Sequence, residues 1–182
     1  NGIPTTTADN IYSMLVGKAG VLTELSINSK ASENGSHKIV VEPIADEYGL
    51  YHYEWVMNNI EYVNKKSGGK IGYIYIPDMS ADGLNEFARY YYPQLDKEAL
   101  IIDDRANGGG NISPMVIERL LREPYRLTMR RGSDLIGTIP EGTFVGPKVC
   151  LIDKYSASDG DLFPWSFRAT GLGELIGTRT WG

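Results

Sequence analysis

The most constraining feature of this sequence is the alternation of short apolar segments with longer amphipathic ones. Three apolar segments are short and contain many β-branched residues, which is typical of strands buried on both faces: 71–76, 99–103 and 149–152. Helical patterns follow them at 84–92, 113–121 and 159–169, and a last short strand is expected at 175–177. The alternation predicts an α/β fold in which helices cover a largely parallel or mixed sheet.

The flanking elements are less regular. Ser113 is expected to cap the helix at 113–121, with Pro114 at its first position. Ahead of the alternation, the patterns predict a helix, two strands joined by a polar loop, and an aromatic stretch that is compatible with a helix in places: 5–15, 21–27 and 38–44, and 48–63.

Composition excludes several classes of partner. The 182 residues carry 23 acidic and 18 basic side chains without a concentrated basic patch, so nucleic acid is not expected to bind. No apolar run approaches the roughly 20 residues that cross a bilayer. Cys150 is the only cysteine and lies in an apolar run, which excludes an intrachain disulfide and cysteine-rich metal sites and favours a core position.

Loops that follow the predicted strands contain residues suited to chemistry. The first loop includes Gly108, Gly109 and Gly110, whose backbone could present N–H groups to an anion near a helix start. The same glycines are also typical of a flexible turn, and their spacing does not fit a phosphate-binding loop. Both interpretations stay open on the residues alone.

The second loop presents serines between a strand and a helix. Ser158 is placed where a nucleophile would be exposed at a sharp turn, with a neighbouring amide to hold an oxyanion. Ser156 and Ser158 could instead cap the helix, with Asp159 or Asp161 favouring its dipole. A third loop, at 177–182, could frame a cleft, or could hold Arg179 as a surface charge and Trp181 as a core aromatic.

Taken together, the loops resemble the S41 family of serine peptidases, which includes carboxy-terminal processing proteases and tricorn-type members. The resemblance is carried by Gly72-Tyr73-Ile74-Tyr75-Ile76, Ile102-Asp103-Asp104-Arg105-Ala106-Asn107-Gly108-Gly109-Gly110, Ser156-Ala157-Ser158-Asp159-Gly160-Asp161 and Ile176-Gly177-Thr178-Arg179-Thr180-Trp181-Gly182. It implies a crotonase/ClpP-like core at 29–182, truncated at its C-terminus, preceded at 1–28 by the end of a PDZ-like domain.

The resemblance also implies roles for single residues. Ser158 aligns with the nucleophile, and the Asp159 N–H contributes to the oxyanion hole with an amide of Gly109 or Gly110. It implies hydrolysis of peptide bonds through an acyl-enzyme, with peptides as partners and neither a cofactor nor a metal. A homo-oligomer is compatible with it, and the compartment stays open between a periplasmic or extracytoplasmic location and the cytoplasm.

The general base is expected outside the sequence. In processing proteases it is a lysine that would align with position 183, and in tricorn-type members, favoured by Asp159-Gly160-Asp161, it is a histidine before the PDZ domain. His37, His52 and Lys154 match neither position, so the chain alone is expected to be inactive. A non-catalytic binding module and a structural scaffold are the alternative functions.

Overall fold

The computed structural model describes residues 2–182, and contacts divide it into two compact units that meet in sequence between Glu54 and Trp55. In the first unit, β1 (Thr23–Ile27) pairs antiparallel with β2 (His37–Val41) across the polar loop. The domain boundary predicted after residue 28 falls in that loop and stays a prediction. The helix expected at 5–15 is wrong in length, because only α1 (Ile11–Met14) forms and none of its residues is buried against a partner.

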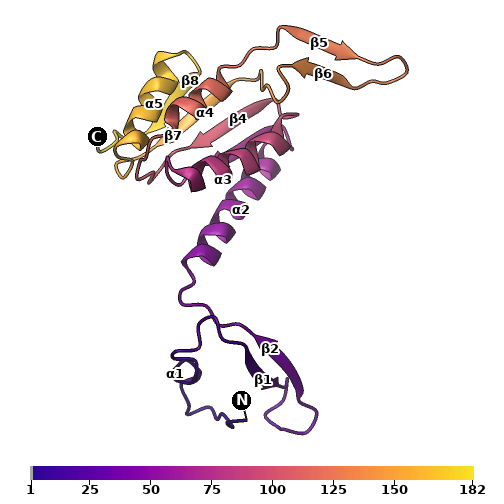
Figure 1. Cartoon of the computed structure of the whole chain (residues 1–182), viewed down its shortest axis with the longest axis vertical. Coiled ribbons are helices and arrows are strands. Elements are labelled where there is room, and N and C mark those ends of the chain that lie inside the picture. Colours follow the sequence, from indigo (N-terminus) through magenta and orange to yellow (C-terminus); the bar gives the residue numbers. More distant parts are fainter. Residues whose placement is uncertain (1) are drawn as a thin grey trace. The chain divides into compact units, whose positions relative to one another are not determined.

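The second unit contains a four-stranded sheet in the order β3-β4-β7-β8 (Figure 1). All neighbouring strands run parallel, which settles the choice between a parallel and a mixed sheet. Its strands and the helices between them are β3 (Ile71–Tyr75), α3 (Ala81–Tyr91), β4 (Ala99–Asp103), α4 (Ser113–Leu120), β7 (Lys148–Ile152), α5 (Asp159–Ala169) and β8 (Gly173–Gly177). The predicted alternation of strands and helices is confirmed.

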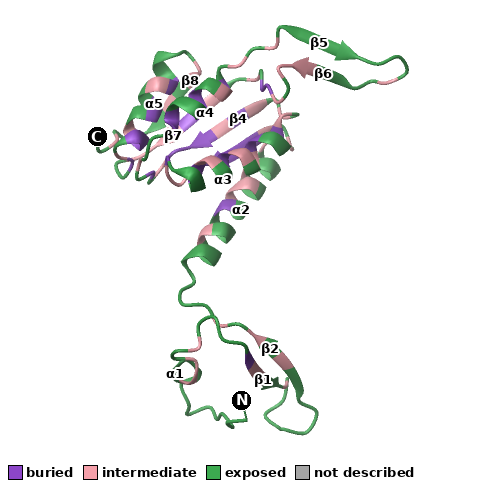
Figure 2. Cartoon of the chain, in the orientation of Figure 1, coloured by how far each residue is buried: buried purple, intermediate pink, exposed green. Residues whose placement is uncertain are grey.

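Alternate residues of the strands pack against different helices. Ile74 and Ile102 face a core that includes Phe87 of α3, Val116 of α4 and Phe163 of α5. Their strand neighbours face α2 (Tyr48–Lys66), where Val56 packs against Tyr73 and Tyr75. Both faces of the sheet are therefore covered, as its apolar sequence predicted, and Figure 2 shows the buried residues gathered along the strands. Cys150 is fully buried in the first of these cores.

Two elements of the second unit were not predicted. A short 3-10 helix, η1 (Tyr92–Gln94), ends the α3 region, and a hairpin formed by β5 (Arg126–Met129) and β6 (Ile136–Ile139) extends from the unit (Figure 1). Every residue of β5 is exposed, so this strand has no half-buried alternation by which it could be recognised. Within residues 2–182 no helix is long and apolar enough to cross a membrane.

Candidate active site

Ser158 lies at the turn between β7 and α5, as predicted, and it is exposed. Its backbone angles, φ 55° and ψ −127°, belong to a region that residues with a side chain rarely adopt. Such a conformation costs about 1–3 kcal/mol and is a recurrent property of strand-to-helix turns that present a nucleophile. Ser158 occupies the N-cap position of α5, as the alternative interpretation expected, but its hydroxyl makes no capping hydrogen bond.

Backbone hydrogen bonds hold this turn on both sides. The Ala157 N–H donates to the Asn107 carbonyl at 2.9 Å, and the Ser158 N–H donates to the Gly182 carbonyl at 2.9 Å. Ser156 is buried, and its hydroxyl donates to the Asp104 carbonyl at 2.7 Å rather than capping α5. The strained conformation of Ser158 is thus fixed by its neighbours.

The glycine turn lies directly against Ser158. A Cβ built on Gly109 would stand 2.6 Å from the Ser158 Cβ and 2.9 Å from the Asp159 nitrogen. A Cβ on Gly110 would stand 1.9 Å from the carbonyl oxygen of Met79. Both positions therefore require glycine, and the interpretation of the loop as a merely flexible turn does not account for this close packing.

The backbone N–H groups around Ser158 differ in whether they already donate a hydrogen bond within the chain. The Gly109 N–H donates to the Asn107 Oδ1 at 2.9 Å. Among residues 2–182, no acceptor bonds the N–H of Gly110 or of Asp159. Asp159 is the first residue of α5, where the backbone N–H groups have no intrahelical partner and favour an anion.

The Asp159 carboxylate connects the starts of two helices. It is buried and accepts hydrogen bonds from the Ser113 N–H at 3.0 Å and the Ser113 hydroxyl at 2.5 Å. The prediction that Ser113 caps α4 is wrong, because Ile112 occupies the cap position and the Ser113 hydroxyl bonds to Asp159 instead. Sequence reasoning considered Asp159 only for its amide and its charge, whereas its side chain has a partner 46 residues away.

The adjacent aspartates Asp103 and Asp104 are both fully buried, which the sequence did not predict, and in the part of the chain that the structure describes only the Asp103 carboxylate has hydrogen-bond partners. The Asp103 carboxylate accepts from the Tyr73 hydroxyl at 2.5 Å and is bridged by the Arg105 guanidinium. Burial and the nearby Asp103 charge raise the pKa of Tyr73, and the hydrogen bond to Asp103 raises the pKa of Arg105. The Arg105 guanidinium also lies 6.0 Å from the centre of the Trp55 ring.

Asp104 directly follows β4 and is fully buried. Within the described chain, neither of its carboxyl oxygens has a hydrogen-bond partner. Burial, with a smaller contribution from the Asp103 charge, raises the pKa of Asp104 to about 9, so this carboxyl is neutral at pH 7. The only signal in the sequence was a second aspartate at the end of a buried strand.

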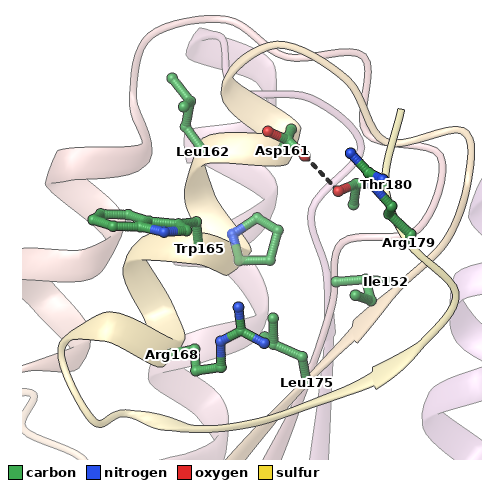
Figure 3. Close-up of a pocket in the computed structure, with 9 residues that line it drawn as sticks. Ile152, Asp161, Leu162, Trp165, Arg168, Leu175, Arg179 and Thr180 are labelled. Carbon is green, nitrogen blue, oxygen red and sulfur yellow. Dashed lines mark hydrogen bonds between the residues drawn. The ribbon is translucent and has the colours of Figure 1, made fainter. Parts of the chain in front are cut away.

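The third loop borders a pocket beside α5 (Figure 3). The pocket, of about 610 Å³, is lined in part by Trp165, Arg168 and Arg179, and the Thr180 hydroxyl bonds to the Asp161 carboxylate at its edge. The prediction of a core position for Trp181 is wrong, since this side chain is 81% exposed. Its backbone N–H donates to the Ser156 carbonyl at 2.8 Å, which ties this loop to the serine turn.

No basic side chain of residues 2–182 is hydrogen-bonded to the Ser158 hydroxyl. The Lys154 ammonium lies 5.1 Å from the centre of the Tyr155 ring, and both residues are exposed. His37 begins β2 and His52 lies in α2, both on the first unit. The same residues include no cluster of three His, Cys, Asp or Glu side chains arranged to hold a metal.

Comparison with known proteins identifies the family to which this chain belongs. The model of a family described as Peptidase family S41 matches residues 70–182, which include the sheet, Ser158 and the glycine turn. The chain belongs to peptidase family S41. This confirms the resemblance predicted from the loops, and the S41 match covers more than half of the chain.

Relatives that match nearly the whole chain include tricorn proteases. The protein is 38% identical to the tricorn protease of Thermoplasma volcanium over 100% of its own length, and 38% identical to that of Thermoplasma acidophilum over 95%. A crystal structure of the tricorn protease superposes over 100% of the chain with a TM-score of 0.86 and 35% identity. The chain spans 16–17% of the length of these proteins.

Proposed function

We propose that this chain carries the nucleophile of a serine peptidase, with Ser158 attacking the carbonyl carbon of a peptide bond. The observation that supports this most directly is the strained, exposed Ser158 beside two backbone amides that have no bonded acceptor within residues 2–182. Membership of family S41 supports the same reaction class.

The chemistry proceeds in two stages, acylation of Ser158 and hydrolysis of the acyl-enzyme. The Ser158 oxygen bonds to the carbonyl carbon, its proton passes to a base, and the carbonyl oxygen becomes an oxyanion held by the Asp159 N–H and an amide of the glycine turn. The C–N bond then breaks and the amine leaves with the proton, which completes acylation. Water next attacks the acyl carbon and gives a proton to the base, the bond from that carbon to the Ser158 oxygen breaks, and the proton returns to Ser158 as the acid product leaves. Gly110 is the better candidate for the second amide, because the Gly109 N–H is already bonded to Asn107.

The base is proposed to come from outside residues 1–182, as a histidine in a tricorn-type arrangement or a lysine aligned with position 183. The proposal also includes a crotonase/ClpP-like core at 29–182, the end of a PDZ-like domain at 1–28, peptide or unfolded-tail substrates and a homo-oligomeric parent. The names of the tricorn relatives support a protease, and the length of those relatives is consistent with further parts.

A fluorophosphonate probe tests the proposal on the full-length protein. We expect one adduct at Ser158, located by peptide mass spectrometry, and loss of peptide hydrolysis by about 10⁴-fold or more in Ser158→Ala. Ser133→Ala, which removes a half-buried serine at the hairpin turn, serves as the matched control and should keep full labelling. A full-length protein that neither reacts at Ser158 nor cleaves peptides would instead support a binding module.

A further inference from the structure

Asn107 is fully buried where three segments of the second unit meet. Its side-chain Nδ2 donates to the Ile76 carbonyl at the end of β3 at 3.0 Å, and its Oδ1 accepts from the Gly109 N–H at 2.9 Å. Its backbone carbonyl accepts from the Ala157 N–H at 2.9 Å. One residue therefore bonds the sheet, the glycine turn and the serine turn.

The partners fix the orientation of the Asn107 amide. The Ile76 carbonyl can only accept, so the Asn107 NH₂ must face it, which leaves the oxygen for the Gly109 N–H. The first turn of α5 packs tightly on the same residue, because a Cβ on Gly160 would stand 2.5 Å from the Asn107 carbonyl oxygen and 2.8 Å from Oδ1. The absence of a side chain at Gly160 is therefore what lets α5 approach Asn107 this closely.

The bond to Gly109 decides which amides are left for a ligand. With the Gly109 N–H bonded to Asn107, the next amide in the turn, that of Gly110, is the one without an acceptor in the described chain. We propose that Asn107 is a positioning residue for the oxyanion site, which holds the glycine turn so that the Gly110 N–H faces the carbonyl oxygen of a substrate bound at Ser158. This inference rests on the proposed function.

The structure supplies a matched control in Gln94. This residue is also a buried carboxamide bonded to the backbone of β3, with Oε1 accepting from the Tyr73 N–H at 2.9 Å and Nε2 donating to the Tyr73 carbonyl at 3.0 Å. Gln94 bonds to neither the glycine turn nor the serine turn. Removing either carboxamide leaves unbonded strand groups, but only Asn107→Ala should change the oxyanion site.

The test compares Asn107→Ala with Gln94→Ala in the full-length protein, using peptide cleavage and a peptide boronate whose bound form is tetrahedral. Asn107→Ala is expected to lower kcat by about 10²-fold, with little change in KM, and to weaken boronate binding by a similar factor. Binding of the corresponding product peptide should stay within about twofold. Gln94→Ala should lower thermal stability while leaving the ratio of boronate to product affinity unchanged.

Rescue by a short hydroxyl completes the test. A serine at this position can accept from the N–H two residues later, as asparagine does, so Asn107→Ser should recover kcat to within about tenfold of the wild type. Equal kcat in the serine and alanine variants, or equal boronate-to-product ratios in Asn107→Ala and the wild type, would overturn the inference. A wild type without Ser158 labelling would overturn the proposed function itself, which is a different outcome.

Discussion

The two strand-to-helix turns at the site reach unusual backbone geometry by different means. Before α4, Gly109 and Gly110 have φ of 91° and 151°, and neither could carry a Cβ without a severe contact. Before α5, Ser158 has φ of 55° and keeps its side chain despite the strain. Gly109 and Gly110 lack side chains where the backbone approaches closely, whereas Ser158, like Ala106 earlier in the first turn with φ of 58°, keeps its side chain at a conformational cost. At Ser158 that cost is expected because the hydroxyl itself is needed.

The largest effect should come from adding a side chain to the glycine turn. Gly110→Ala places a Cβ 1.9 Å from the Met79 carbonyl oxygen, a backbone atom that cannot move independently, and we expect a loss of about 4 kcal/mol in the free energy of unfolding. Gly108→Ala is the matched control, because a Cβ there meets nothing within 4 Å. It should change stability by less than about 0.5 kcal/mol in urea titrations. Equal losses in both variants would contradict the close approach.

The second prediction concerns Asp104, whose backbone carbonyl accepts bonds from Asn107 and Ser156 and so joins the two turns. Its pKa is raised to about 9 in the fold from an unfolded value near 3.8, so between these values the unfolded state binds fewer protons. The free energy of unfolding is therefore highest below about pH 4, where Asp104 is protonated in both states. As pH rises from there towards 9, Asp104 lowers this free energy by up to about 1.4 kcal/mol per pH unit.

Replacement of Asp104 tests whether stability falls as pH rises. Asp104→Asn cannot ionise, so its stability should depend less steeply on pH, and the variant should gain on the wild type between pH 5 and pH 8. Asp103→Asn, in the adjacent residue, should instead lose stability at both pH values, because it weakens the bonds to Tyr73 and Arg105. Parallel pH profiles of wild type and Asp104→Asn would show that the buried carboxyl is not neutral.

A smaller effect is expected from the carboxylate that connects the starts of the two helices. Asp159→Ala leaves the buried N–H and hydroxyl of Ser113 without their acceptor, which should cost about 2 kcal/mol. Asp161→Ala removes a carboxylate two residues later, whose partner is the less buried Thr180, and should cost less than half as much. Thermal unfolding of the two variants gives the comparison, and equal losses would argue against a specific link.

The smallest effect concerns the strain at Ser158. Ser158→Gly removes the side chain from a left-handed backbone and should stabilise the chain by about 0.5–1 kcal/mol, while abolishing the nucleophile. Ser158→Ala also abolishes the nucleophile but keeps the Cβ, so it should not gain this stability. Identical unfolding temperatures for the two variants would show that the turn is not strained.

Local pattern was enough for most of the second unit. The strands at 71–75, 99–103 and 148–152 follow from short apolar runs, and α5 begins and ends at the predicted residues. The pattern failed where packing was absent, as in the predicted helix at 5–15, and where the strand residues are exposed, as in the hairpin. Regular spacing of apolar residues indicates that one face of a helix or strand is buried. Elements without a buried face therefore give little signal in the sequence.

The sequence by itself determined which residue types stand at the site, because glycines and a serine between a strand and a helix are set by local backbone preferences. Only the tertiary structure decided what their backbone and side chains bond. Ser113 bonds to Asp159 across 46 residues, Asn107 accepts from the Gly109 amide, and burial raises the pKa of Asp104 beside Asp103, which Arg105 bridges. Hydrogen-bond partners and burial depend on segments brought together by the sheet, and that information is absent from any short stretch of sequence.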